Sequence, residues 1–517
     1  MRHDNLSRAL IAIACMLIPI GDYLARAQSM FLVDPSGSGD FLTIQDAIDA
    51  TVSHPDSEVI VTPGIYVVSL STAGKAFTLR SQDPSDPIIV AATVLDEIEV
   101  NGPPIISVTN QETPSTVISG FTFRSTTPAT TANSLGTGVR VENASGVTIR
   151  QCVFSGLFAL DFGGAIGIDN ASDVIIDRCI FQDNQAGQNG GAIYASAALS
   201  LIIHDCLFEN NSAPWGGAVF ITLTRTSIKR TDFVRNEAFT PGGGALSVDQ
   251  QTNESSVAGC RFIENQSITA VGGAYLGGSR DRLTFVNCLF AANSASLRGG
   301  ALFSSTGSST KVISCTFTNN SSPEGGAIRM FDRTAPGLVA NCVSWANSSP
   351  DDFGNAVLAN CLVEGGWPGI GNFSADPMFA DVGLENYRLG PGSPAIDAGD
   401  NAALPTDVTD LDDDGDFIEL VPVDLDSNPR RLDDPLTVDT GLGKVPVIDI
   451  GAYEFASTGS TCLADCDASG ALNVDDIDCF VAGFLAGDLA AADCDGNGTI
   501  NIDDIDCFVN AFLAGCP

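Results

Sequence analysis

Basic residues are scarce in this sequence. Lys and Arg number 24 against 63 Asp and Glu, which leaves a formal net charge of −39 over 517 residues. Nucleic acids and anionic membranes bind proteins through clustered positive charge, so we exclude both as partners. Calcium is instead the natural counter-ion for clustered Asp side chains. Histidine is also rare, with three residues in the whole chain, so a catalytic set built on His has few candidates.

Long apolar runs are missing as well. After residue 27 no segment reaches the roughly 18 consecutive apolar residues of a membrane-spanning helix. The run from Ala9 to Ile20 is shorter, follows Arg2 and Arg8, and precedes an A-x-A site at residues 25–27. This is the pattern of a secretory signal peptide with its cleavage site. We therefore predict that residues 1–27 are a signal peptide and that the mature protein is secreted, either free or attached to a cell surface.

Within the repeats the sequence also lacks long segments with apolar residues at helical spacing. Helical repeats need about ten or more residues with apolar spacing near 3.6, whereas the apolar runs here are short and rich in β-branched residues. Gly, Ser and Asn separate these runs, and such residues accept tight bends and left-handed backbone. The composition indicates many short strands joined by tight turns.

A repeat organises the chain between about residues 143 and 361. A Gly-Gly-Ala triplet recurs, with its first glycine at Gly163, Gly190, Gly216, Gly243, Gly272, Gly299 and Gly325. A second pattern, C-x-F-x-x-N, keeps step with it and begins at Cys179, Cys206, Cys260, Cys288 and Cys315. A fixed period of this length with short strands predicts a parallel β-solenoid whose coils stack about 4.8 Å apart. We expect a right-handed coil, because crossovers between parallel strands prefer that hand.

Stacking places equivalent residues above one another. The Cys and Phe positions are predicted to form internal ladders, and the Asn positions a stack of side-chain amides at a turn. Export would permit disulfides. We nevertheless expect the repeat cysteines to be free thiols that act as small buried hydrophobes, since stacked, parallel side chains rarely reach disulfide geometry.

The alternation of G-G-A with F-x-x-N over residues 162–361 resembles the repeat of the polymorphic outer-membrane proteins. These belong with the pectin-lyase-like right-handed parallel β-helices, a superfamily that includes lyases, hydrolases, adhesins and scaffolds. Further upstream, Thr43 and Asp46 have the spacing of a helix-start box, and the segment resembles the entry of pectin methylesterases. We predict an N-terminal capping helix there that covers the open end of the solenoid.

The predicted fold is thus all-β, a right-handed parallel β-helix over residues 28–455. Its closing segment, 390–455, resembles the end of many exported bacterial β-helices. Within this segment Asp410, Asp412, Asp414 and Asp416 alternate around a glycine, which predicts either a calcium site or a solvated acidic loop. Residues 456–461 are small and polar, as expected of a linker.

Residues 462–517 contain two copies of a twelve-residue loop of the EF-hand type. Oxygen-bearing side chains occupy positions 1, 3, 5, 9 and 12, glycine occupies position 6, and position 7 offers its carbonyl. The predicted ligands of two calcium ions are Asp465, Asp467, Ser469, Ala471, Asn473 and Asp476 in the first loop, and Asp493, Asp495, Asn497, Thr499, Asn501 and Asp504 in the second. Each loop leads into a segment with helical apolar spacing, which makes a small α-type domain.

This pair of loop-plus-helix units, or F-hands, resembles the dockerin type I module. The resemblance implies a cohesin-like or other surface protein as partner. The sequence departs from the dockerin pattern at loop positions 10 and 11, where Val474-Asp475 and Ile502-Asp503 stand in place of polar recognition residues. Six cysteines in an exported module this small suggest disulfides. Of the fifteen possible pairings, the symmetric one joins Cys466 to Cys479, Cys494 to Cys507 and Cys462 to Cys516.

A complete catalytic set is not evident. Enzymes of the resembled superfamily use Asp-bound calcium with an Arg or Lys base, or sets of Asp with Arg or His. The candidates here are the dipeptides Asp177-Arg178, His204-Asp205 and Lys229-Arg230, whose register is open. The leading hypothesis is a secreted, calcium-binding β-helix that binds glycans or acts as a scaffold. The alternatives are an extracellular polysaccharide lyase or glycoside hydrolase and, less favoured because no carboxyl-terminal membrane barrel is evident, an autotransported adhesin.

Overall fold

The computed structural model describes most of the chain between residues 29 and 456 and part of the C-terminal module. The described residues are 29–97, 103–109, 115–125, 135–240, 242–250, 254–331, 337–350, 353, 356–456, 474–486, 505, 508, 509 and 512. The predicted signal peptide and eleven of the twelve predicted calcium ligands lie outside them. The twelfth, Asp476, is described only as part of a helix, so the signal peptide and both calcium loops remain predictions. Within the described residues no helix is both long enough and apolar enough to cross a membrane.

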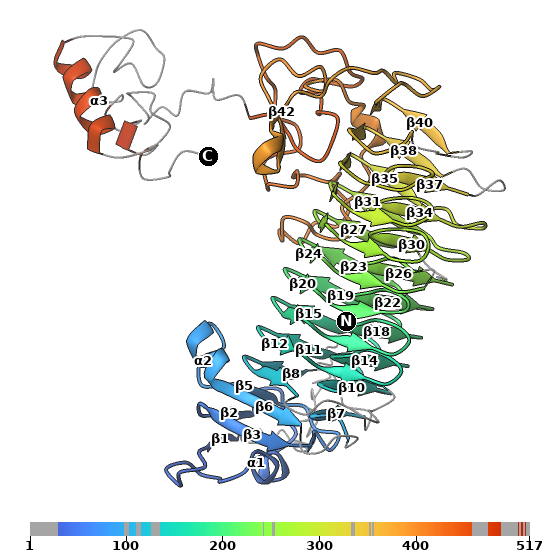
Figure 1. The fold of residues 1–517 in the computed structure, drawn as a ribbon. Coiled ribbons are helices and arrows are strands. Elements are labelled where there is room, and N and C mark those ends of the chain that lie inside the picture. Colours follow the sequence, from blue (N-terminus) through green and yellow to red (C-terminus); the bar gives the residue numbers. More distant parts are fainter. Residues whose placement is uncertain are drawn as a thin grey trace, which may run out of the picture.

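Residues 30–363 wind into a parallel β-solenoid (Figure 1). Parallel pairing along each face joins every coil to the next, as the repeat predicts. The first sheet contains β1 (Met30–Val33), β2 (Glu58–Val61), β5 (Thr78–Ser81), β8 (Thr116–Ser119), β11 (Val147–Arg150), β15 (Val174–Asp177), β19 (Leu201–His204), β23 (Thr226–Lys229), β27 (Ser255–Ala258), β31 (Leu283–Val286), β35 (Lys311–Ile313), β38 (Leu338–Ala340) and β40 (Val357–Ala359).

Two further long sheets and one narrow sheet complete the coils. The second sheet contains β3 (Gly64–Val68), β6 (Thr93–Glu97), β9 (Thr122–Arg124), β12 (Val153–Ser155), β16 (Ile180–Gln182), β20 (Leu207–Glu209), β24 (Asp232–Val234), β28 (Arg261–Ile263), β32 (Leu289–Ala291), β36 (Thr316–Thr318), β39 (Val343–Trp345) and β41 (Leu362–Val363). The third contains β4 (Leu70–Ser71), β7 (Ile106–Val108), β10 (Val139–Glu142), β14 (Ile166–Asp169), β18 (Ile193–Ser196), β22 (Val219–Thr222), β26 (Leu246–Asp249), β30 (Tyr275–Gly277), β34 (Leu302–Ser304) and β37 (Ile328–Met330). The narrow sheet contains β13 (Phe158–Ala159), β17 (Gln185–Ala186), β21 (Ser212–Ala213), β25 (Glu237–Ala238), β29 (Gln266–Ser267) and β33 (Ser294–Ala295).

The predicted ladders run through the core. The buried Phe rings of successive coils stack face to face, with centroids 4.5 to 4.9 Å apart, from Phe123 through Phe154, Phe181, Phe208, Phe233, Phe262 and Phe290 to Phe317. The eight repeat cysteines are all buried free thiols, as predicted. At the coil that has no cysteine, the hydroxyl of Thr231 takes the thiol's place and accepts the Cys206 N–H at 3.4 Å.

The Gly-Gly-Ala triplets mark the places where neighbouring coils approach most closely. Gly216 has φ +61°, in the left-handed region that favours glycine. A Cβ on Gly217 would lie 2.0 Å from the carbonyl oxygen of Gly244 on the next coil. The first glycine therefore makes the turn, and the second lets the backbones stack.

Two short helices lie at the N-terminal end of the solenoid. Helix α1 (Ile44–Ala50) begins where the sequence predicts it, with Thr43 accepting the Asp46 N–H at 3.2 Å. Its buried residues, Ile44, Ala47 and Ile48, join the solenoid core. That α1 serves as a cap remains a prediction. Helix α2 (Pro87–Ala92) was not expected, although Asp86 as N-cap before a proline is a start signal.

The closing segment lies against the last coils and has little regular structure. The antiparallel pair β42 (Phe379–Asp381) and β43 (Asn386–Leu389) and the 3-10 turn η1 (Val382–Leu384) immediately precede the closing segment, and the 3-10 turn η2 (Asn401–Ala403) lies within the segment. Its Ile450 and Ala395 pack on Val343 of the solenoid. The guanidinium of Arg430 is buried with the carboxylate of Glu454, at 3.2 Å. In the C-terminal module, helix α3 (Val474–Ala486) begins within the last three positions of the first predicted calcium loop.

Candidate functional site

Strand register gathers the charged dipeptides found in the sequence on one edge of the first sheet. Asp177 pairs with His204, and His204 pairs with Lys229, on adjacent coils. The residue after each of these lies at the turn that leads to the second sheet, with left-handed φ between 45° and 53° at Arg178, Asp205 and Arg230. Two short columns therefore lie side by side, one formed by Asp177, His204 and Lys229 and the other by Arg178, Asp205 and Arg230.

These side chains contact one another directly. His204 Nδ1 lies 3.4 Å from Asp177 Oδ1 and 3.1 Å from Asp205 Oδ2. The Arg178 guanidinium is 2.7 Å from Asp177 Oδ2. Arg230 donates two hydrogen bonds to Asp205, of 2.8 and 2.9 Å. Acids and bases thus converge on the outside of the solenoid and largely neutralise one another.

The acidic loop of the closing segment docks onto the same columns. The ammonium of Lys229 contacts the carbonyl of Asp410 and the carboxylate of Asp413, and Arg230 Nη2 lies 2.7 Å from Asp413 Oδ2. Leu411 packs among Val286 and other apolar side chains of the first sheet. No pattern in the sequence predicts this long-range contact, because nothing periodic relates the loop to the repeats.

The carboxyl of Asp205 has a strongly shifted acidity. Burial opposes its ionisation, but the hydrogen bonds and charges of Arg230 and His204 outweigh burial and lower its pKa to about 2. In return, the hydrogen bond from Arg230 to Asp205, together with the charges of Asp205 and Asp413, raises the pKa of Arg230. A carboxylate with so low a pKa is a weak proton acceptor, so Asp205 is poorly suited to act as a general base.

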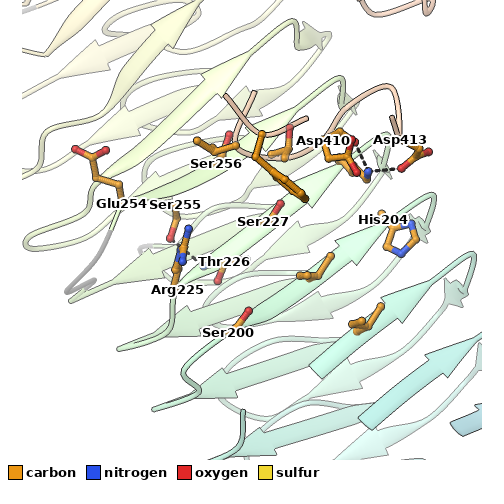
Figure 2. A pocket seen from close by; sticks show the side chains of 16 residues that line it. Ser200, His204, Arg225, Thr226, Ser227, Glu254, Ser255, Ser256, Asp410 and Asp413 are labelled. Atoms are coloured by element: carbon orange, nitrogen blue, oxygen red, sulfur yellow. Dashed lines mark hydrogen bonds and ion pairs between the residues drawn. The ribbon is translucent and has the colours of Figure 1, made fainter. Parts of the chain in front are cut away.

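A groove of about 390 Å³ lies between this cluster, the first sheet and the acidic loop (Figure 2). Its floor carries hydroxyl side chains on two adjacent coils, where Ser227 pairs with Ser256, and the same row continues as Ile202 on the coil before. The walls carry different chemistry, with the lining residues Arg225 and Glu254 on the solenoid and Asp410, Asp413 and Phe417 on the loop. Hydroxyls that donate and accept, an arginine and an exposed aromatic ring suit a hydroxyl-rich ligand.

Three of the four predicted calcium ligands of the acidic loop lie close together, and the fourth does not join them. Asp410, Asp412 and Asp414 each offer a carboxylate oxygen, all within 4.8 Å of one another. Asp416 is engaged differently, since its Oδ1 accepts the Ile418 N–H at 2.9 Å. Val421, at the twelfth position, is buried in the apolar contact with Leu411. The donor set suits a hard cation, and calcium at this loop remains a prediction.

In the C-terminal module the described residues belong to the two predicted helical segments. Phe480 stacks on Phe508 with ring centroids 4.1 Å apart, so the two segments pack together. Several apolar side chains of these segments stay outside this contact, including Val481 and Leu485. Together they line an apolar hollow of about 530 Å³. Cys479 is disulfide-bonded, while the five other cysteines of the module lie outside the described residues, so the pairing remains a prediction.

Comparisons with known proteins agree with the solenoid. Residues 104–290 match the family model described as the right-handed β-helix region, and residues 314–329 match that of the Chlamydia polymorphic membrane protein repeat. The predicted right-handed β-helix and the resemblance of its repeat to the polymorphic membrane proteins are thereby supported. No curated protein matches the chain.

Several solved structures are similar at low identity. Pectate lyase Pel9A is 12% identical, with 83% of this chain and 97% of that chain covered and a TM-score of 0.39. PfbA, a surface adhesin of Streptococcus pneumoniae, is 13% identical, with 62% and 86% covered and a TM-score of 0.36. An alginate lyase from Paenibacillus sp. is 14% identical, with 57% and 94% covered and a TM-score of 0.31.

Proposed function

We propose that this protein is a secreted or surface-attached β-helix that binds polysaccharide in the groove between β19, β23, β27 and the acidic loop. The observation that supports this is the lining of the groove, in which Ser227 and Ser256 continue from coil to coil beside Arg225 and Phe417. Hydroxyls on two adjacent coils can hydrogen-bond a hydroxyl-rich ligand, and an aromatic ring can pack against the apolar face of a sugar. The excess of acidic residues favours a neutral glycan over a polyanion.

Arg225→Ala is expected to weaken glycan binding about tenfold or more, because an arginine hydrogen bond to a ligand contributes roughly 1.5–3 kcal/mol. Isothermal titration against a panel of neutral and uronate-containing polysaccharides measures this. Arg261→Ala is the matched control, since Arg261 belongs to β28 of the second sheet and pairs with Asp232 at 3.0 Å. Equal affinities of the two variants, or no binding across the panel, would contradict the proposal.

An extracellular polysaccharide lyase or glycoside hydrolase is the second candidate, favoured by the convergence of Asp177, His204 and Asp205. Against it stand the ion pairs that occupy these groups and the low pKa of Asp205. Assays for unsaturated uronate products and for new reducing ends, with calcium present, separate the two functions. Product formation that is lost in His204→Ala, while Arg261→Ala stays active, would establish the enzyme.

We further propose that residues 462–517 form a calcium-ordered attachment module whose apolar hollow receives a partner protein, cohesin-like or of another surface class. The repeated loop sequence and the packing of Phe480 on Phe508 support this. The double variant Asp465→Ala/Asp493→Ala removes the first ligand of each loop and is expected to release two calcium ions per chain. Equilibrium dialysis of the full chain counts them, and an unchanged count would contradict the calcium assignment.

A further inference from the structure

Asp397 lies at a tightly held position of the closing segment. The residue is completely buried. Its carbonyl accepts the N–H groups of Thr440 and Gly441 at 2.9 and 3.0 Å, and its own N–H donates to Asp449 Oδ1 at 2.7 Å. The backbone of Asp397 is therefore fixed between two other stretches of the segment, which holds the residue in the interior.

The carboxylate of Asp397 makes no hydrogen bond by distance and angle among the described residues, although the nearby backbone amide of Asp434 favours its ionised form. Both side-chain oxygens are buried, and neither is within hydrogen-bonding geometry of a donor among the described residues. The guanidinium of Arg430, buried in the same segment, is engaged with Glu454 and with the carbonyls of Asp449 and Gly451. Buried carboxylates are otherwise hydrogen-bonded or paired, because an unpaired one is strongly destabilising.

Two further carboxylates converge on it. Asp433 and Asp439 are exposed, and one oxygen from each lies within 4.8 Å of an oxygen of Asp397 and of the other. Burial and the charges of Asp433 and Asp439 raise the pKa of Asp397 to about 6, while the backbone amide of Asp434 acts in the opposite direction. Three carboxylates held this close repel one another unless a positive charge lies between them.

We propose that Asp397, Asp433 and Asp439 bind a calcium ion that cross-links two stretches of the closing segment. All three donors are carboxylate oxygens, which favours a hard cation over zinc or copper. Calcium takes six to eight oxygens in flexible geometry, and the exposed side of the site, at Asp433 and Asp439, leaves room for water to complete the shell. The ion would join the buried turn at residue 397 to the stretch 433–439.

Asp397→Asn tests the proposal in the full chain, because the amide has the same shape and lacks the charge. Calcium-stripped protein is titrated with calcium, bound ions are counted by equilibrium dialysis, and thermal unfolding is followed with and without the ion. The variant is expected to bind one ion fewer than the parent and to gain less thermal stability from calcium. Glu385→Gln is the control, since it removes an exposed charge just before the closing segment and away from the site.

A second variant keeps the test decisive if Asp397→Asn fails to fold. Asp439 is exposed, so Asp439→Asn leaves the core intact and is expected to lose the same single ion. Both variants are also made in the Asp465→Ala/Asp493→Ala background, which removes the predicted loop sites, so that failure of either assignment is recognised separately. A calcium count and affinity in Asp439→Asn equal to those in Glu385→Gln would overturn the proposal.

Discussion

Phe208→Ala is expected to lower the free energy of unfolding of the solenoid by about 4 kcal/mol. Phe208 is fully buried in the middle of the aromatic ladder, with the rings of Phe181 and Phe233 stacked at 4.6 and 4.9 Å on either side. Truncation leaves a cavity between two coils and removes both ring contacts, each worth about 0.5–1.5 kcal/mol beyond burial. Equilibrium unfolding in urea measures the change.

The matched control is Phe239→Ala, because 38% of the Phe239 side chain is already exposed. We expect less than about 1 kcal/mol there. A solenoid can lose coils one after another instead of all at once. Hydrogen exchange of the amides in β16, β20 and β24 therefore accompanies the urea curve and locates the loss. A Phe208→Ala protein as stable as Phe239→Ala would mean that the ladder does not hold the coils together.

The repeat predicts the ladders because periodicity carries three-dimensional information directly. Once coils stack, residues one period apart become neighbours, so the stacking of Phe181 on Phe208 follows from the sequence alone. The same reasoning predicts part of the candidate site. Asp177 and His204 each lie two residues before an equivalent cysteine, Cys179 or Cys206, so the repeat predicts that Asp177 and His204 share a column. The observed strand pairing confirms this.

The rest of the site depends on contacts that no period encodes. Lys229 meets Asp413 because the closing segment folds back along the first sheet, and a lone acidic loop gives no indication of where it docks. The meeting of Asp397 with Asp433 and Asp439 likewise depends on how an irregular segment folds. Local turn signals there predict bends but not which bends come together. Irregular segments are therefore where the sequence is least informative, and the carboxylate clusters at Asp397 and Asp410 lie in such a segment.

Asn236→Ala is expected to cost about 3 kcal/mol, because the buried Asn side chain satisfies two backbone groups of the preceding coil. Its Oδ1 accepts the Asn211 N–H at 2.9 Å, and its Nδ2 donates to the Phe208 carbonyl at 2.8 Å. Alanine leaves the Asn211 N–H buried without this acceptor, and each buried polar group left unpaired costs about 1–3 kcal/mol. Urea unfolding gives the total, and hydrogen exchange at Asn211 reports the local loss.

Asn210→Gly separates this ladder effect from a general loss of asparagine. Asn210 directly precedes the ladder residue Asn211. Its side chain is exposed, and its backbone has φ 54°, which glycine accepts readily. Its replacement should change the unfolding free energy by less than about 0.5 kcal/mol. If Asn236→Ala were equally mild, the backbone of the turn would have to relax enough to satisfy Asn211 in another way. The amide stack would then be a consequence of coil stacking and not one of its causes, and the aromatic ladder alone would set the register of the coils.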